Sequence, residues 1–233
     1  MHYLLSIMIL VSSLSYAEDV PAKKVVLNML DGFNKMADNK AKYVKGEISY
    51  KQYMSTDSTL ADRTSKLIDF YDVCEKSLKY DYDSTTKKFR SDHWAGKGEN
   101  DRNNFVSIFK QLIESIVYPI ANDYFGSYNM THSVLESSKN KAVIRSIVQN
   151  KKKRRMNFIM DWYIQNNNGE WKIYDVDVDG ERWVPSFRSQ FNEVISKKSY
   201  SKLIDLMKKK LKETKDERAK TDKADRLAAK KGA

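Results

Sequence analysis

Apolar side chains recur every three to four residues in six segments of the chain, a spacing that predicts amphipathic helices. Pro119 lies inside the fourth segment. Because its ring removes a backbone donor and clashes with the preceding turn, we expect a kink there. The polar stretch 84–104 contains Gly96 and Gly98 and indicates a loop. The predicted helices cover residues 21–39, 60–71, 73–78, 105–124, 183–195 and 200–211.

Between residues 130 and 178 the apolar period changes to two, which is typical of strands. On the last predicted strand this alternation places Tyr174, Val176 and Val178 on one side and three aspartates on the other, solvated side. Short polar links join the segments and favour an antiparallel meander. The order of elements predicts an α+β fold in which several helices pack against an antiparallel four-stranded sheet. The predicted strands are 130–138, 141–150, 155–165 and 170–178.

The start of the chain has the pattern of a secretory signal peptide. The first seventeen residues contain no Lys, Arg, Asp or Glu, and small residues stand at Ser15 and Ala17. The apolar run at 4–11 is well short of the roughly 20 residues that span a bilayer, so we expect a cleaved leader at 1–17. An α+β domain at 18–211 follows. Beyond it, at 212–233, no apolar face persists, and we expect a charged tail that is a frayed helix or disordered.

The formal net charge of +11 is unevenly distributed along the chain. More than half of the excess positive charge lies between Lys208 and Ala233, and a second cluster reads KKKRR at 151–155. Such runs are usually solvated, but each basic residue near an anionic membrane gains about 1 kcal/mol. Because the chain carries an export pattern, we expect no nucleic-acid partner.

Residues suited to catalysis or metal binding are few. His93 and His132 are not spaced with Cys, Asp or Glu as metal ligands are. Cys74, the only cysteine, lies where a small buried residue is expected. The segment DVDVDG at 175–180 matches half of a calcium loop, but its twelfth position is Ser186 instead of the required acid. We therefore expect no metal site, no catalytic residue and no cofactor.

The segment 171–191 carries a more specific pattern, in which a strand with a Trp and an Asp precedes a Gly and then a helix with an Arg, a Gln and aromatic residues. Its positions are Trp171, Asp175, Gly180, Phe187, Arg188, Gln190 and Phe191. This pattern resembles a signature of the MlaC family of periplasmic phospholipid-binding proteins. A looser likeness extends upstream through LIDFYDV at 67–73, Trp94 and the helical stretch that begins near Asp101.

The resemblance implies an apolar cavity, of an MlaC or NTF2-like appearance, that takes phospholipid acyl chains between the sheet and the helices. It implies a monomeric, non-enzymatic periplasmic carrier that moves lipid between an inner-membrane ABC transporter complex and an outer-membrane lipoprotein or porin complex. We expect basic residues to contact headgroups or membrane at Lys151, Lys152, Lys153, Arg154 and Arg155. We expect the cavity lining to be Phe105, Phe109, Leu112, Ile116, Tyr124, Phe158, Met160, Trp162, Tyr174, Val176, Phe187 and Phe191.

Two other classes of protein remain open at this point. An exported enzyme of similar architecture would use Asp161 and Asp175 as an acid and a base on a polar cavity floor. An envelope interaction module would use the basic tail and have a filled core. Stoichiometric lipid in a solvent extract of the purified protein would favour the carrier over both.

Overall fold

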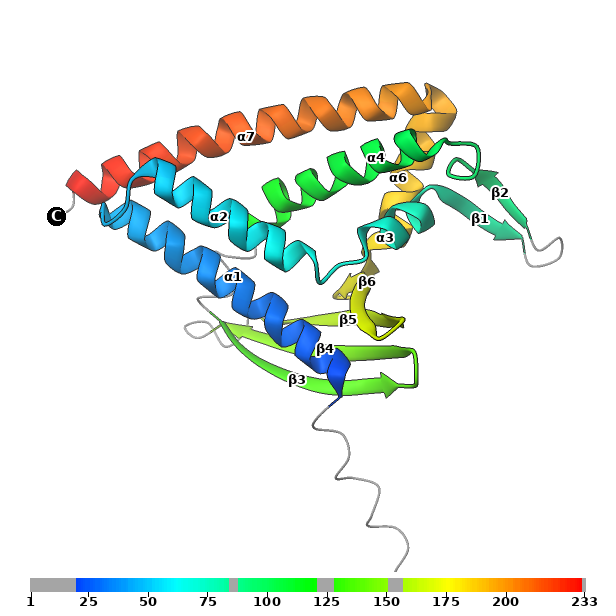
Figure 1. Cartoon of the computed structure of the whole chain (residues 1–233), viewed down its shortest axis with the longest axis horizontal. Coiled ribbons are helices and arrows are strands. Elements are labelled where there is room, and N and C mark those ends of the chain that lie inside the picture. The colour runs from blue at the N-terminus through cyan, green and yellow to red at the C-terminus, as the bar shows by residue number, and fades with distance from the viewer. Residues whose placement is uncertain (1–19, 84–87, 121–127, 151–156, 232–233) are drawn as a thin grey trace, which may run out of the picture.

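The structure, a computed structural model, describes residues 20–83, 88–120, 128–150 and 157–231 (Figure 1). Its helices are α1 (Pro21–Lys45), α2 (Tyr50–Ser65), α3 (Phe70–Ser77), α4 (Glu99–Leu112), the π-helical turn η1 (Ile113–Val117), α6 (Trp183–Lys197) and α7 (Tyr200–Lys231). Its strands are β1 (Lys79–Asp83), β2 (Lys88–Asp92), β3 (Tyr128–Ser137), β4 (Lys141–Asn150), β5 (Asn157–Asn167), β6 (Glu170–Val178) and β7 (Glu181–Arg182). The predicted signal peptide lies outside the described residues.

The main sheet is a fully antiparallel meander in the order β3-β4-β5-β6-β7. The prediction of an α+β fold is confirmed, but the prediction of four strands is wrong, because β7 adds a fifth. Asp179 and Gly180 have φ values of 52° and 92°, the positive values that a type I′ hairpin turn requires. This turn reverses the chain at once, so that Arg182 pairs with Asp177.

A separate two-stranded hairpin, β1-β2, stands beside α6 at one end of the molecule (Figure 1). Strand β2 and the start of α4 at Glu99 both lie within 84–104, where we predicted a loop. That prediction is wrong because the ladder hydrogen bonds of a hairpin join backbone groups and do not require an apolar face.

The predicted helix at 60–71 is interrupted after Ser65. The backbone N–H of Asp69 donates to the carbonyl of Ile173 (2.8 Å), and the N–H of Ile173 donates to the carbonyl of Leu67 (2.8 Å). The Asp69 side chain also accepts from the N–H of Asp72 and caps α3. These bonds tie the α2–α3 link to β6 and place Ile68 beside the sheet.

The expected distortion near Pro119 takes the form of a π-helical turn. Regular α-helix ends at Leu112, and the N–H of Tyr118 donates to the carbonyl of Ile113, five residues earlier. Proline cannot donate to the carbonyl four residues before it, and a wider turn accommodates the missing bond. The extra residue per turn changes which side chains face the sheet.

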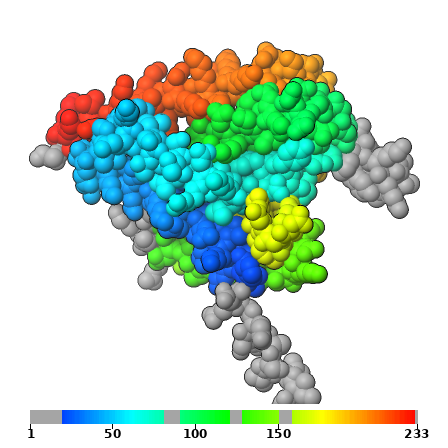
Figure 2. All heavy atoms as spheres, in the orientation of Figure 1, coloured from blue at the N-terminus to red at the C-terminus, as the bar shows by residue number. Residues whose placement is uncertain are grey.

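The helices form a layer on one face of the sheet (Figures 1 and 2). Helix α1 crosses the sheet and contacts β4, β5 and β6, while α2, α4 and α7 pack farther from it. Alternate β5 side chains point to the two faces, and Ile159 on the face away from the helices is 40% exposed. Within the described ranges, no helix is both long and apolar enough to cross a membrane.

Helix α7 continues to Lys231, so the segment from Lys212 is helical in the described residues, which was one of the two expected alternatives, but it does not show the expected fraying. Its second half packs against α1 and α2. The contacts there are polar: Arg218 binds Tyr53 and Asp57, and Arg226 lies over the ring of Tyr43. Because these contacts replace an apolar stripe, the hydrophobic pattern alone did not reveal them.

Candidate ligand-binding pocket

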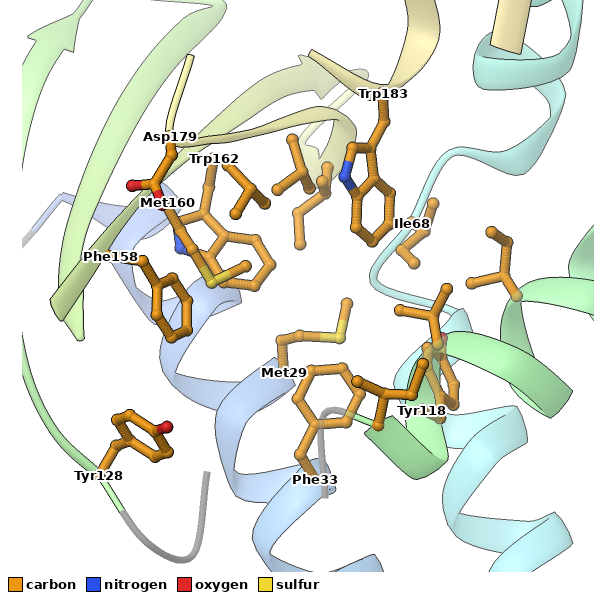
Figure 3. A pocket seen from close by; sticks show the side chains of 16 residues that line it. Met29, Phe33, Ile68, Tyr118, Tyr128, Phe158, Met160, Trp162, Asp179 and Trp183 are labelled. Atoms are coloured by element: carbon orange, nitrogen blue, oxygen red, sulfur yellow. The ribbon is translucent and has the colours of Figure 1, made fainter. Parts of the chain in front are cut away.

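An apolar pocket of about 490 Å³ lies between the inner face of the sheet, α1 and the π-helical turn (Figure 3). Its volume falls within the roughly 300–1,000 Å³ typical of small-molecule sites. Ile120, which is 53% exposed, belongs to the lining, so the pocket reaches the surface. The lining residues are Met29, Phe33, Ile68, Ile113, Val117, Tyr118, Ile120, Tyr128, Phe158, Met160, Trp162, Ile173, Val176, Val178, Asp179 and Trp183.

Strand β5 supplies one wall through uninterrupted alternation. Phe158, Met160 and Trp162 all face the pocket, as the period of two predicts. The intervening residues Ile159 and Asp161 point to the opposite face of the sheet, where Asp161 binds Arg145. The alternation therefore separates a dry face from a polar one.

Strand β6 departs from simple alternation because it contains a β-bulge. Tyr163 pairs with Asp175 and Ile164 pairs with Ile173, which leaves Tyr174 without an opposite residue. Ile173 and Val176 consequently both line the pocket. The prediction that Tyr174 shares the face of Val176 and Val178 is wrong: its ring contacts that of Tyr163, with the centroids 6.2 Å apart, and the ammonium group of Lys76 lies 4.2 Å from its centroid.

The Trp162 indole is fixed from behind the pocket wall. Its Nε1–H donates to Ser146 Oγ at 2.8 Å, and this buried oxygen lies 2.8 Å from Nδ1 of His132. Burial, aided by the charge of Lys23, lowers the pKa of His132. The neutral imidazole can therefore accept the Ser146 proton, and the three groups form a satisfied chain across β3, β4 and β5.

Tyr118 is held in a similar way on the helical side. Ser65 donates to Glu114 (2.6 Å), and the Tyr118 hydroxyl lies 2.9 Å from Ser65 Oγ. Burial raises the pKa of Tyr118, so its hydroxyl stays protonated and donates to Ser65. The ring faces the pocket beside Phe33, with the two ring centroids 5.2 Å apart.

Four of the predicted lining residues lie at the pocket: Phe158, Met160, Trp162 and Val176. Leu112 and Ile116 do not line it, because the π-helical turn presents Ile113 and Val117 instead. Tyr124 lies outside the described residues, as do Lys151, Lys152, Lys153, Arg154 and Arg155.

The remaining four predicted residues form a packed aromatic cluster beside the pocket. Phe105 meets Phe191 edge to face with ring centroids 5.6 Å apart, and Phe109 meets Phe187 in the same way at 5.1 Å. Phe109 and Phe187 also line a small hollow of about 40 Å³ that adjoins the pocket. The four residues are apolar and packed together, and the hydrophobic pattern did not distinguish packed rings from a pocket wall.

Sequence reasoning missed the contributions of Met29, Phe33, Tyr128 and Trp183. Met29 and Phe33 belong to the apolar stripe of α1, and the same spacing would suit an ordinary core helix. Only the way α1 crosses the sheet in the folded protein distinguishes Met29 and Phe33 from ordinary core residues. Trp183 offered a signal, because it is a large aromatic residue three positions after the Gly of the Asp-Gly turn, at the start of a helix.

The two aspartates considered for acid–base chemistry do not converge in the pocket. Asp161 is paired with Arg145 on the outer face of the sheet. Asp175 accepts from Arg182 (2.8 Å) and from the N–H of Val184 (2.9 Å) in the first turn of α6. The expectation that Asp175 lies on a solvated face is wrong, because it is buried where it caps a helix N-terminus and binds an arginine.

Metal-binding and thiol chemistry find no support in the described part of the chain. It contains no group of three or more His, Cys, Asp or Glu side chains that could hold a metal ion. Cys74 is buried, and burial raises the pKa of its thiol well above the usual range. A thiol in such surroundings is a poor nucleophile.

Helices on one face of an antiparallel sheet, with an apolar pocket between them, define an α+β protein with a site for an apolar ligand. The chain belongs to the MlaC protein family, whose pattern matches residues 54–209. No curated protein matches it.

Among solved structures, the fold is similar to that of a phospholipid-binding protein from Ralstonia solanacearum, determined in complex with a phospholipid. The TM-score is 0.61 at 16% sequence identity, and the alignment covers 82% of this chain and 95% of the other. This likeness establishes the fold.

Proposed function

We propose that this protein is a periplasmic phospholipid carrier that holds acyl chains in the pocket between the sheet and the helices. The main support for this proposal is the chemistry of the lining. Among the lining residues that the structure describes, only Asp179 is charged. Its Oδ1 accepts from the backbone N–H of Ile159 at 2.8 Å, so part of its charge is compensated by the backbone of β5. Membership of the MlaC family and the phospholipid bound by the Ralstonia protein support this proposal.

The energetics of lipid transfer suit such a carrier. Burying each acyl methylene is favourable by about 0.8 kcal/mol, so a two-chain lipid does not cross water unaided. Moving it from a membrane to an equally dry pocket changes the hydrophobic term little. Direction must therefore come from docking partners, for which we propose an inner-membrane ABC transporter complex and an outer-membrane lipoprotein or porin complex.

We propose that the lipid headgroup stays near the basic run at Lys151 to Arg155. This run joins β4 to β5, and β5 places Phe158 in the pocket wall only three residues after Arg155. Five adjacent positive charges would attract an anionic headgroup or an anionic membrane surface. The signal-peptide pattern at 1–17 supports action in the periplasm.

Solvent extraction of the purified full-length protein, followed by mass spectrometry, tests the proposal. We expect phospholipid at roughly one molecule per chain, the occupancy of a single preformed site. An extract without phospholipid, from protein that also takes up none from vesicles, would refute it. The enzyme alternative predicts an empty extract.

The variant Met160→Glu should lose most of this lipid. The substitution places a carboxylate among apolar side chains at the pocket wall, where an unpaired charge is costly to bury. Ile159→Glu is the matched control, because it makes the same chemical change one residue away on the exposed face of β5. Equal lipid content in the two variants would contradict the assignment of the pocket.

A further inference from the structure

Two apolar cavities meet at Trp183. The main pocket and the small hollow share the side chains of Ile68, Ile113, Ile173, Val176 and Trp183. The Trp183 indole hangs from the start of α6 into the main pocket and points toward Met29 (Figure 3). The Trp183 ring therefore lies where the main pocket, which could take a ligand, adjoins the small hollow.

The hollow behind Trp183 leads away from the pocket toward the aromatic cluster. Its further walls come from Phe70, Val73, Phe109 and Phe187. At about 40 Å³ it is too small for a ligand of its own, but its surface is apolar. It adjoins the main pocket at the side chains that the two spaces share, and Trp183 is one of these.

Trp183 is held less firmly than Trp162, the other tryptophan of the lining. Trp162 is 3% exposed, and its indole N–H donates to Ser146. Within the described ranges the Trp183 indole N–H donates no hydrogen bond, and the ring touches the cluster through one edge contact with Phe187, at 6.3 Å. Trp183 is also the first residue of α6, where no preceding helical turn restricts the side chain.

We propose that Trp183 is the stop that sets how long an acyl chain the pocket admits. The proposal rests on the proposed function and assigns the chain-length preference of that site to one residue. A chain entering from the surface would run along Phe158, Met160 and Met29 and end against the indole. Removing the ring would join the hollow to the pocket and extend the path toward Phe109 and Phe187.

The effect on selectivity follows from the cost of a methylene that cannot be buried. A vesicle buries every methylene of its lipids. A pocket that is shorter than the acyl chain leaves the chain's remaining methylenes in water or excludes the chain. Each such methylene lowers the relative affinity about fourfold. Every methylene admitted by removing the indole should therefore raise the bound ratio of long-chain to short-chain lipid about fourfold.

A competition experiment measures this ratio. Lipid-free protein is incubated with vesicles that contain equal amounts of dimyristoyl, dipalmitoyl and distearoyl phosphatidylglycerol, separated from them, and analysed by native mass spectrometry. The chains compared are the parent, Trp183→Ala, Trp183→Phe and the control Trp171→Ala. Trp171 is a half-buried tryptophan of β6 that packs against the core and lines neither cavity.

We expect Trp183→Ala to raise the distearoyl to dimyristoyl ratio at least about fourfold, the value for one methylene. Trp183→Phe should shift it less and in the same direction, while Trp171→Ala should leave it unchanged. If the parent binds lipid but the Trp183 variants keep the parent ratio, the role proposed for Trp183 is refuted and the proposed function is not affected. A parent that binds no phospholipid would overturn the proposed function. If Trp183→Ala does not fold, an unchanged ratio in Trp183→Phe is sufficient to reject the inference.

Discussion

Arg218 carries the attachment of the second half of α7 to the rest of the molecule. Its Nη2 donates to Tyr53 Oη and Asp57 Oδ2, both at 2.7 Å, and its Nε lies 3.7 Å from Asp222 Oδ2. The side chains of Arg218, Asp57 and Asp222 are only 19%, 8% and 3% exposed. One guanidinium therefore compensates two carboxylates that have little access to water.

The substitution Arg218→Met removes the charge and keeps much of the apolar side chain. Both carboxylates would then lie buried without their cation, and Asp57 Oδ1 already has no hydrogen-bond partner in the structure. Breaking a buried ion pair by removing one partner costs about 3–5 kcal/mol. We expect a loss of this size in the free energy of unfolding at neutral pH, which is a large share of the roughly 5–15 kcal/mol typical of a folded protein.

The loss in the free energy of unfolding caused by Arg218→Met should be smaller at acidic pH. Burial raises the pKa of Asp222, and Arg218 is the main influence that lowers it. A carboxyl group whose pKa is higher in the folded state destabilises the fold above that pKa, and the penalty disappears as pH falls toward the unfolded value. Without Arg218 the folded-state pKa should rise further. The gap between variant and parent should therefore be widest at neutral pH and narrower at acidic pH.

Urea denaturation followed by far-ultraviolet circular dichroism, at neutral and mildly acidic pH, measures both effects. Lys220→Met is the matched control, because it removes an exposed cation from the same helix. Adding Asp57→Asn and Asp222→Asn to Arg218→Met should recover part of the loss. A variant within about 0.5 kcal/mol of its parent at neutral pH, the range of ordinary surface substitutions, would refute the reasoning.

Two further predictions concern the helix pair α1–α2 and the basic run. Gly32→Ala should destabilise the fold by about 1–3 kcal/mol in urea denaturation, because the added Cβ would lie 2.2 Å from Thr64 Oγ1. Adding Thr64→Ala to this variant should restore much of the lost stability. An unchanged urea midpoint for Gly32→Ala alone would contradict the close packing of the two helices. Replacing Lys151, Lys152, Lys153, Arg154 and Arg155 by Gln should weaken binding to phosphatidylglycerol vesicles at least about tenfold in a sedimentation assay, given about 1 kcal/mol per basic residue at the surface. Undiminished binding would assign vesicle contact to another surface.

The sequence predicted β5 well because nothing interrupts its alternation. Phe158, Met160 and Trp162 lie on one face in the structure as in the pattern. Strand β6 has an equally regular pattern, yet Tyr174 leaves the predicted face because a bulge shifts the phase by one residue. The bulge follows from the pairing of β6 with β5, and no local pattern in β6 marks it.

Helix α7 shows a different limit of hydrophobic periodicity. Beyond Leu211 its contacts with α1 and α2 run through Arg218 and Arg226, so an apolar stripe is not what holds it. Two other signals were present in the sequence: the segment contains neither Gly nor Pro between Tyr200 and Lys231, and it is rich in good helix formers. Pairs such as Lys209 with Glu213 add support one helical turn apart.

The pocket itself could be predicted only in part, because its walls come from distant segments and an apolar pattern does not distinguish a wall from a core. Phe105 and Phe109 have the same periodicity as Ile113 and Val117, yet the first pair packs in the aromatic cluster. The π-helical turn and the crossing of α1 decide which side chains remain beside open space. Both depend on tertiary packing.

Polar anchors behind the apolar walls explain how the fold keeps this space. The pocket reaches the surface at Ile120, so water can enter it and meet its apolar walls. Leaving so much apolar surface in contact with water is unfavourable, and this favours collapse of the walls onto one another. Collapse is opposed where wall residues are tied outward, as Trp162 is to Ser146 and Tyr118 is to Ser65. An apolar ligand that fills the pocket is covered by walls on several sides and removes their apolar surface from water, so an acyl chain gains more binding free energy there than on a flat apolar surface.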